Sequence, residues 1–186
     1  LLGGFSFLSQ ILGLIRDRTL ANVVGAGSTL DIYYAAFRIP DFLYLSIASL
    51  ASITVLMPFL MEKMDSESDS KEKARKFLNN IFSAYMLFMV AASLLIVILM
   101  PYIGRYIAPG FSEIQLSALT TMSRIMLLSP IFIGLSNLLG TVTQLFKNFL
   151  IFSLSPVFYN IGILTGIIFL YPVCGVYGLG LGVIIG

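Results

Sequence analysis

Residues 9–17 read Ser9-Gln10-Ile11-Leu12-Gly13-Leu14-Ile15-Arg16-Asp17, and residues 36–41 read Ala36-Phe37-Arg38-Ile39-Pro40-Asp41. Both stretches place charged residues inside or beside long apolar segments. A lone charge in a lipid bilayer costs between about 3 and 15 kcal/mol, so such a charge usually marks function and has a partner or water. These charged positions are therefore the first candidates for a functional site, with the apolar segments as its scaffold.

The composition predicts a membrane protein. Of the 186 residues, 58% are hydrophobic and only 11% are charged, whereas about 25% of an average soluble domain is charged. The apolar residues also form long blocks instead of alternating with polar ones. We therefore expect an all-α, polytopic bundle of transmembrane helices.

The apolar blocks predict about six spans in one transmembrane lobe. A helix needs about 20 apolar residues to cross a hydrocarbon core about 30 Å thick. Because the sequence lacks an initial Met and ends inside an apolar run, we interpret the chain as a piece of a longer protein. The predicted spans cover approximately residues 1–24, 30–61, 77–106, 116–146, 150–171 and 176–186, the last one cut short.

The charged loop 63–76 predicts the orientation in the membrane. It contains Lys63, Lys71, Lys73, Arg75 and Lys76, whereas the segments 25–30, 107–115 and 172–175 contain no Lys or Arg. Basic loops stay on the cytoplasmic side of a membrane. The loop 63–76, Lys147 and the N-terminus are therefore expected in the cytoplasm.

Several function classes are excluded by residues that the sequence lacks. It has no His and a single Cys, Cys174, which excludes His-based metal sites, His-based catalysis and an internal disulfide. The net charge of +2 does not indicate a nucleic-acid partner. We therefore expect neither an enzyme nor a cofactor.

The first segment has a polar stripe. Gly3, Ser6, Gln10, Gly13 and Asp17 follow one another at spacings of three and four residues, which places them on one helical face. Close packing against another helix would explain the small residues. It does not explain Gln10 and Asp17, which indicate a cavity that contains water.

The two arginines of the opening segments are expected at similar depth. At 1.5 Å per residue, Arg16 lies about 12 Å below the outer end of the first span, and Arg38 about 10 Å below that of the second. We expect Asp17 and Asp31 to compensate them on antiparallel neighbouring helices. Pro40 is expected to disturb the second helix, because proline lacks an N–H. A structural set of ion pairs is the alternative interpretation.

The sequence resembles the MurJ/MviN family of lipid II flippases. The resemblance rests on several motifs and covers nearly the whole chain. The motifs are Ser9-Gln10-x-x-Gly13-x-x-Arg16-Asp17, Gly25-Ala26-Gly27-x-x-x-Asp31, Ala36-Phe37-Arg38-Ile39-Pro40-Asp41, Pro58-x-Leu60, Ala108-Pro109-Gly110-Phe111, Arg124-Ile125-Met126 with Pro130, and Pro156-x-x-x-Asn160.

The resemblance implies the fold of the multidrug/oligosaccharidyl-lipid/polysaccharide exporters, with two six-helix lobes around a cavity, of which this chain would be the first. It also implies a flippase of the bacterial inner membrane for an undecaprenyl-pyrophosphate-linked peptidoglycan precursor. By the same resemblance, Arg16 matches a cavity arginine, and Asp31 and Arg38 match charged positions of the second helix. The implied partners are the lipid-linked substrate, membrane lipid and the second lobe.

The sequence departs from the family at four positions. Gln10 stands where the family usually has Arg, Tyr44 and Leu45 replace a basic pair, and Ser49 replaces Glu. The lost charge favours a sister exporter with another cargo, such as a polysaccharide-lipid or a cationic drug. A scaffold that transports nothing remains a third alternative.

Two further features complete the candidates. Arg124 in the fourth span either faces the cavity or pairs with an acid elsewhere. The predicted substrate-binding residues are thus Arg16, Arg38, Asp31, Asp17, Gln10 and Arg124. Glycines four residues apart at Gly162 and Gly166, and at Gly178, Gly182 and Gly186, favour close helix contacts over a hinge.

Overall fold

The computed structural model describes residues 2–48, 70–145 and 148–186, and this part of the chain is almost entirely helical. The predicted all-α membrane bundle is thereby confirmed. The elements are α1 (Leu2–Val23), α2 (Ser28–Ala48), α4 (Ser70–Ile107), α5 (Glu113–Met126), α6 (Ser129–Leu145), α7 (Phe149–Thr165), the π-helical turn η1 (Gly166–Leu170), α8 (Tyr171–Cys174) and α9 (Val176–Ile185).

Three stretches of the described residues are long and apolar enough to cross a membrane, namely Arg75–Ile107, Glu113–Gln144 and Phe152–Cys174. The helices α1 and α2 have 22 and 21 residues, so they are about 33 and 32 Å long, although they are not among these three stretches. They carry the charged residues quoted above. The rest of the second predicted span (49–61), the loop residues 63–69 and Lys147 lie outside the described residues.

The helix α2 continues through Pro40 without a break, so Pro40 does not interrupt it. Pro40 is fully buried. Its missing N–H deprives only the Ala36 carbonyl of a helical partner.

The helix α4 begins earlier than expected, because residues 70–76 are helical and do not belong to a loop. Lys, Glu, Arg and Ala in this stretch are all good helix formers. The side chains of Glu72 and Lys76 also form an ion pair of 2.8 Å one helical turn apart, which supports this first part of the helix.

The fourth predicted span consists of two helices, α5 and α6, with a turn at Leu127 and Leu128. Pro130 follows directly and cannot donate to the carbonyl of Met126, which explains a break at this point. At the other end of α5, the Ser112 side chain accepts from the Gln115 N–H, and the Gln115 side chain accepts from the Ser112 N–H. This capping box fixes the start of α5 three residues before the predicted one.

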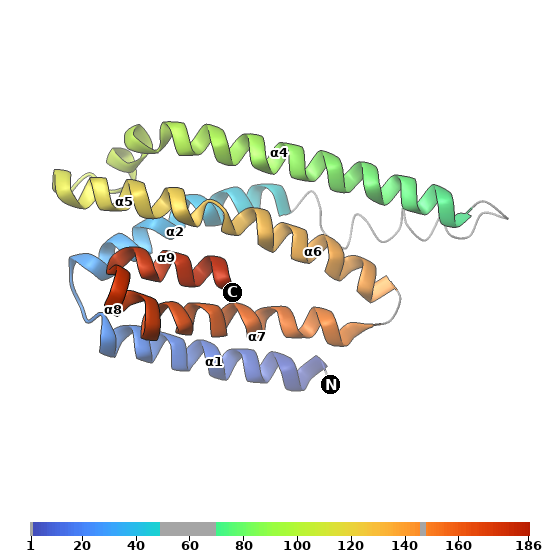
Figure 1. Cartoon of the computed structure of the whole chain (residues 1–186), viewed down its shortest axis with the longest axis horizontal. Helices are drawn as coiled ribbons and strands as arrows, with labels where there is room; N and C mark the ends of the chain where they lie inside the picture. The colour runs from blue at the N-terminus through green and yellow to red at the C-terminus, as the bar shows by residue number, and fades with distance from the viewer. Residues whose placement is uncertain (1, 49–69, 146–147) are drawn as a thin grey trace.

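The helices run roughly parallel or antiparallel to one long axis, with α1 at one edge and α4 at the opposite edge (Figure 1). The helix α1 packs chiefly on α7, whereas α2 packs chiefly on α5 and α6. The expectation that α1 and α2 pack along each other is therefore wrong. The helix α9 lies between α5 and α7 and contacts both, and it contributes Leu179 and Val183 to the main buried core.

Glycines allow α9 to touch α7 and η1 backbone to backbone. A Cβ on Gly166 would lie 2.6 Å from the Gly182 Cα, and one on Gly182 would lie 3.0 Å from the Gly162 carbonyl oxygen. No side chain fits into such a contact. The prediction that these glycines provide close helix packing is confirmed.

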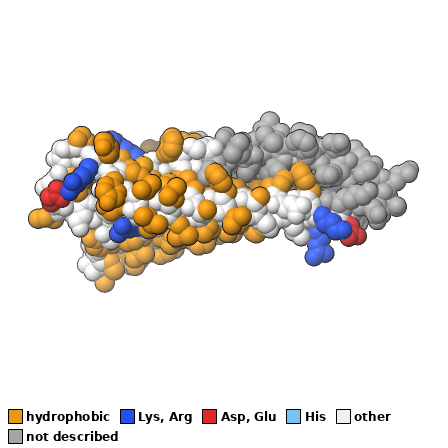
Figure 2. Space-filling model, turned by 90° about the horizontal axis from the view of Figure 1, so that it is seen from above, with side chains coloured by type: hydrophobic (Ala, Val, Ile, Leu, Met, Phe, Trp, Pro, Cys, Tyr) orange, Lys and Arg blue, Asp and Glu red, His pale blue; other side chains and the backbone are white. Residues whose placement is uncertain are grey.

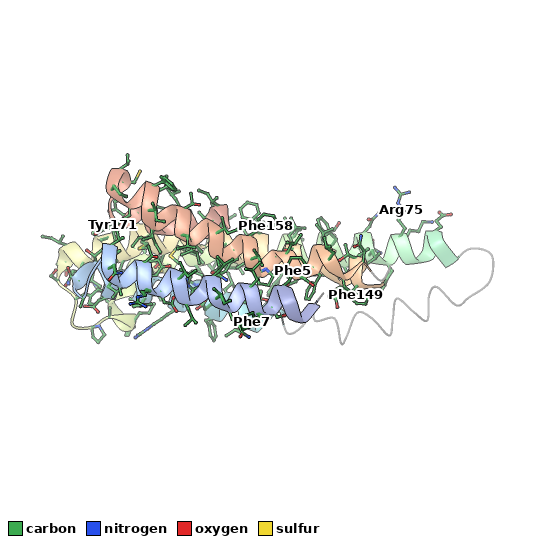
Figure 3. The ribbon with its side chains drawn as sticks, turned by 90° about the horizontal axis from the view of Figure 1, so that it is seen from below. Phe5, Phe7, Arg75, Phe149, Phe158 and Tyr171 are labelled. Carbon is green, nitrogen blue, oxygen red and sulfur yellow. The ribbon has the colours of Figure 1, made fainter. Side chains whose placement is uncertain are left out.

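The outer surface suits a lipid environment. Figure 2 shows hydrophobic side chains across the middle of one face and charged side chains toward its two ends. On the side formed by α1 and α7, Phe7 and Phe158 are 65% and 58% exposed and lie on the outside of their helices (Figure 3). This distribution is that of a multi-pass membrane protein.

Candidate functional site

A cavity of about 300 Å³ lies where α1, α2 and α7 meet. We call it the arginine pocket. It brings together Arg16 and Arg38, as the sequence predicted for a shared chamber, and it also contains Asp17. Its lining consists of Arg16, Asp17, Leu20, Tyr33, Tyr34, Phe37, Arg38, Asp41, Tyr159 and Ile163.

Arg16 is held from two sides. Its Nε and Nη2 atoms each lie 2.8 Å from Oδ1 of Asp17, and its Nη1 donates to Oδ1 of Asn160 at 3.1 Å. The Arg16 side chain is 28% exposed and that of Asp17 58%. The counter-charge therefore comes from the next residue of the same helix, while a neutral amide of α7 holds the other end of the guanidinium.

Asn160 joins α7 to α1 through both ends of its side chain. Besides accepting from Arg16, its amide nitrogen donates toward the Ser9 carbonyl and hydroxyl oxygens, both at 3.2 Å. The same nitrogen lies 3.0 Å from the Pro156 carbonyl oxygen. Asn160 is buried, with 7% of its surface exposed. A buried amide with this many partners fixes the relative position of the two helices.

Arg38 lines the pocket and also contacts the end of another helix. Its Nη1 donates to the carbonyl oxygen of Ile107, the last residue of α4, at 3.1 Å. The final carbonyls of a helix lack a helical partner and carry partial negative charge, so a guanidinium stabilises them. Arg38 is exposed and retains further N–H groups for a ligand, because a guanidinium has five.

Aromatic rings form much of the remaining wall. Tyr33 and Phe37 lie one turn apart on α2, with ring centres 4.9 Å apart in an edge-to-face arrangement. Tyr33 is buried, and Tyr159 of α7 also lines the pocket. These rings restrict the space in which the guanidinium groups are presented to a ligand.

The formal charges of the pocket balance. Two arginines, Arg16 and Arg38, stand against two aspartates, Asp17 and Asp41. Guanidinium groups can bind two oxygens of a phosphate at once and remain charged in any protein environment. The arrangement can therefore bind an oxyanion while the empty pocket avoids a net charge.

A family model described as "Lipid II flippase MurJ" matches residues 20–186. The chain belongs to the MurJ lipid II flippase family. A solved structure titled "Lipid II flippase MurJ, inward closed conformation" superposes with a TM-score of 0.81 at 26% sequence identity. That match covers 99% of this chain and 38% of the solved chain.

Relatives within the MurJ family come from several bacteria. The chain is 30% identical over 188 residues to the lipid II flippase MurJ of Burkholderia cenocepacia, covering 98% of this chain and 36% of the relative. It is 29% identical over 163 residues to the probable lipid II flippase MurJ of Rickettsia prowazekii, covering 87% of this chain and 32% of the relative. The chain thus spans about a third of the length of these relatives.

Three of the predicted MurJ site residues lie outside the pocket lining, namely Asp31, Gln10 and Arg124. Asp31 is exposed in the first turn of α2 and forms no ion pair with the described residues, so the expectation that it compensates an arginine is wrong. A carboxylate there stabilises the positive end of the helix dipole. Gln10 is exposed on α1, six residues before Arg16.

Arg124 does not line the arginine pocket, and it forms no ion pair with an acid among the described residues. Its Nε donates to the Val97 carbonyl oxygen of α4 at 3.0 Å. In a helix this carbonyl would accept from residue 101, which is Pro101 and has no N–H. Arg124 therefore supplies the donor that the proline lacks, and its role in substrate binding stays a prediction.

Sequence reasoning missed Asn160, Tyr33 and Tyr159 as site residues, and its final set of substrate-binding residues left out Asp41. Asn160 carried a usable signal, because an amide in the apolar segment 149–165 needs a partner.

Three of the positions that depart from the family pattern are Tyr44, Leu45 and Ser49. The Tyr44 hydroxyl accepts a hydrogen bond from Asn137 of α6 at 2.6 Å, and Leu45 is 67% exposed. Ser49 lies outside the described residues.

Proposed function

We propose that the full-length protein is a lipid II flippase that moves an undecaprenyl-pyrophosphate-linked saccharide from the inner to the outer leaflet by alternating access. The observation that carries this proposal is the pair of arginines, Arg16 and Arg38, in one pocket of a MurJ-family fold. This chain then forms the first of two lobes, and the second lobe closes the other side of the cavity.

The physical task of such a protein is to carry a charged head group through hydrocarbon while the lipid tail stays in the bilayer. Arg16 and Arg38 provide the phosphate contacts. Asp17 neutralises Arg16 when the pocket is empty, at 2.8 Å. Arriving phosphate takes over donors that the carboxylate and the Ile107 carbonyl used before, so the two guanidinium groups have an acceptor in both states.

The protein lies in the inner membrane with its N-terminus in the cytoplasm, and the arginine pocket lies in the outer half of the bilayer. The basic residue Arg75 supports this orientation, because it projects from the start of α4, at the far end from the pocket. Arg75 is labelled in Figure 3. The partners of the protein are the lipid-linked substrate, the surrounding membrane lipid and the second lobe.

The proposal is tested by complementation with the full-length protein in a strain depleted of its own flippase. Arg16→Lys should grow clearly worse than the wild type at equal membrane abundance, because lysine keeps the charge but cannot bind two oxygens in a planar fork. Arg18→Lys is the matched control, since exposed Arg18 belongs to the same helix but does not line the pocket. Full complementation by Arg16→Lys would argue against bidentate phosphate binding.

A second candidate is a sister exporter with another cargo, favoured by the balanced charges of Arg16, Arg38, Asp17 and Asp41. A native mass spectrum of the detergent-purified full-length protein distinguishes the two. A co-purified polyprenyl-pyrophosphate lipid with a peptidoglycan-precursor head group supports the flippase, whereas one with another saccharide supports the sister exporter.

A further inference from the structure

Asn160 of α7 is hydrogen-bonded to α1 at two places, one of them in the arginine pocket. Its side-chain oxygen accepts from Arg16 of α1, and its side-chain nitrogen donates to Ser9. Ser9 lies two turns before Arg16 in α1. We propose that Asn160 is a positioning residue, which orients the Arg16 guanidinium for the substrate pyrophosphate and makes its position depend on α7. This inference rests on the proposed function.

The orientation of the Asn160 amide is determined by its surroundings. Three acceptor oxygens, two from Ser9 and one from Pro156, surround the nitrogen, and a guanidinium N–H points at the oxygen. A flipped amide would turn its N–H groups toward the guanidinium and its oxygen toward two carbonyl oxygens, keeping only a hydrogen bond from the Ser9 hydroxyl. The amide oxygen is therefore held toward Arg16.

The link to Asn160 differs in kind from the link to Asp17. Asp17 belongs to α1 and moves with Arg16, so it neutralises the guanidinium without tying it to the rest of the lobe. Of the hydrogen bonds described for Arg16, the one to Asn160 reaches another helix. A long side chain held from two sides loses less conformational freedom when it binds a ligand, and this raises affinity.

The neutral amide also leaves the charge of Arg16 available. A carboxylate at position 160 would still orient the guanidinium but would compete with phosphate for it. The proposal therefore predicts an order of affinities. Asn160→Ala should weaken pyrophosphate binding about tenfold, the usual scale of a hydrogen bond to a charged group. Asn160→Asp should weaken it further: its carboxylate keeps the contact with Arg16 but cannot donate to the Ser9 and Pro156 carbonyl oxygens.

The test is titration of the full-length protein in detergent with inorganic pyrophosphate by calorimetry, together with the melting temperature of each ligand-free variant. The matched control is Asn137→Ala, which removes another hydrogen bond between helices, from Asn137 to Tyr44. The control should lower the melting temperature but leave pyrophosphate affinity unchanged. Should Asn160→Ala fail to fold, Asn160→Asp alone decides.

The outcomes separate this inference from the proposed function. Wild-type affinity in both Asn160 variants, with a loss of affinity in Arg16→Gln, would overturn the positioning role alone. An equal loss of affinity in Asn137→Ala and Asn160→Ala would also overturn it, because a purely structural role predicts that result. Wild-type affinity in Arg16→Gln would overturn both proposals, since the pocket would then not be the anion site.

Discussion

At the scale of single residues, Arg16, Arg38 and Arg124 each connect two helices of this chain through a group that carries no full charge. Arg38 donates to the terminal carbonyl of α4, and Arg124 donates to the carbonyl of Val97 in the same helix. Arg16 reaches α7 through a neutral amide. Helix ends and prolines create such acceptors inside a membrane bundle, and a guanidinium satisfies them without a buried carboxylate.

The pairing of Arg124 with Pro101 can be tested by a double-mutant cycle. Arg124→Gln should lower the free energy of unfolding by about 1–3 kcal/mol, because it leaves the Val97 carbonyl without its charged donor. In a Pro101→Ala background, residue 101 has an N–H that can donate to this carbonyl. Arg124→Gln should therefore lower the free energy of unfolding by clearly less in that background. The measurement is reversible unfolding in mixed micelles. Equal costs in the two backgrounds would show that the proline is not involved.

The sequence predicted that Arg16 and Arg38 share a pocket, but it did not predict which residues bind these two arginines. The depth of Arg16 and Arg38 followed from helix geometry alone, and both line one cavity. The role of Asp31 was mispredicted because spacing along a helix does not reveal which helix lies opposite. Asn160 was missed as a site residue because its contact with Arg16 spans 144 residues of sequence, a separation at which periodicity carries no information.

At the scale of elements, glycine spacing determines how closely two helices approach. Gly162 and Gly166 in α7 and η1 face Gly178 and Gly182 in α9, and the contacts are between main-chain atoms. The sequence predicted this packing because four-residue spacing keeps small residues on one face. It did not predict the start of α4 at Ser70, since charged residues suit a solvated helix as well as a loop.

Substitution of one glycine of α9 tests this packing. Gly182→Ala should destabilise the protein by about 1–3 kcal/mol, because the added carbon meets the Gly166 Cα at 2.5 Å and the backbones must separate. Gly180→Ala is the control in the same helix, where the added carbon would meet the Met126 side chain at 3.4 Å. Thermal unfolding of both variants should show a clear loss for the first and little change for the second. Equal melting temperatures would contradict the close contact.

At the scale of the whole molecule, the lobe is arranged so that its first helix is attached mainly through α7. The helix α1 packs on α7, while α2 belongs to the part built with α5 and α6. The arginine pocket lies between these two parts and takes residues from both. A relative movement of α7 would therefore change the distance between Arg16 and Arg38 directly.

The orientation of the lobe gives a prediction that uses its native cysteine. Cys174 is exposed in α8, at the turn before α9, and the proposed orientation, based on the basic start of α4, predicts that this turn lies outside. In a full-length protein whose other cysteines are replaced, a membrane-impermeant maleimide should label Cys174 in intact spheroplasts. Arg75→Cys in a Cys174→Ser background should react only after the membrane is opened, since Arg75 is exposed at the opposite end. The reverse labelling pattern would show that the lobe has the opposite orientation in the membrane. The arginine pocket would then lie in the cytoplasmic half of the bilayer.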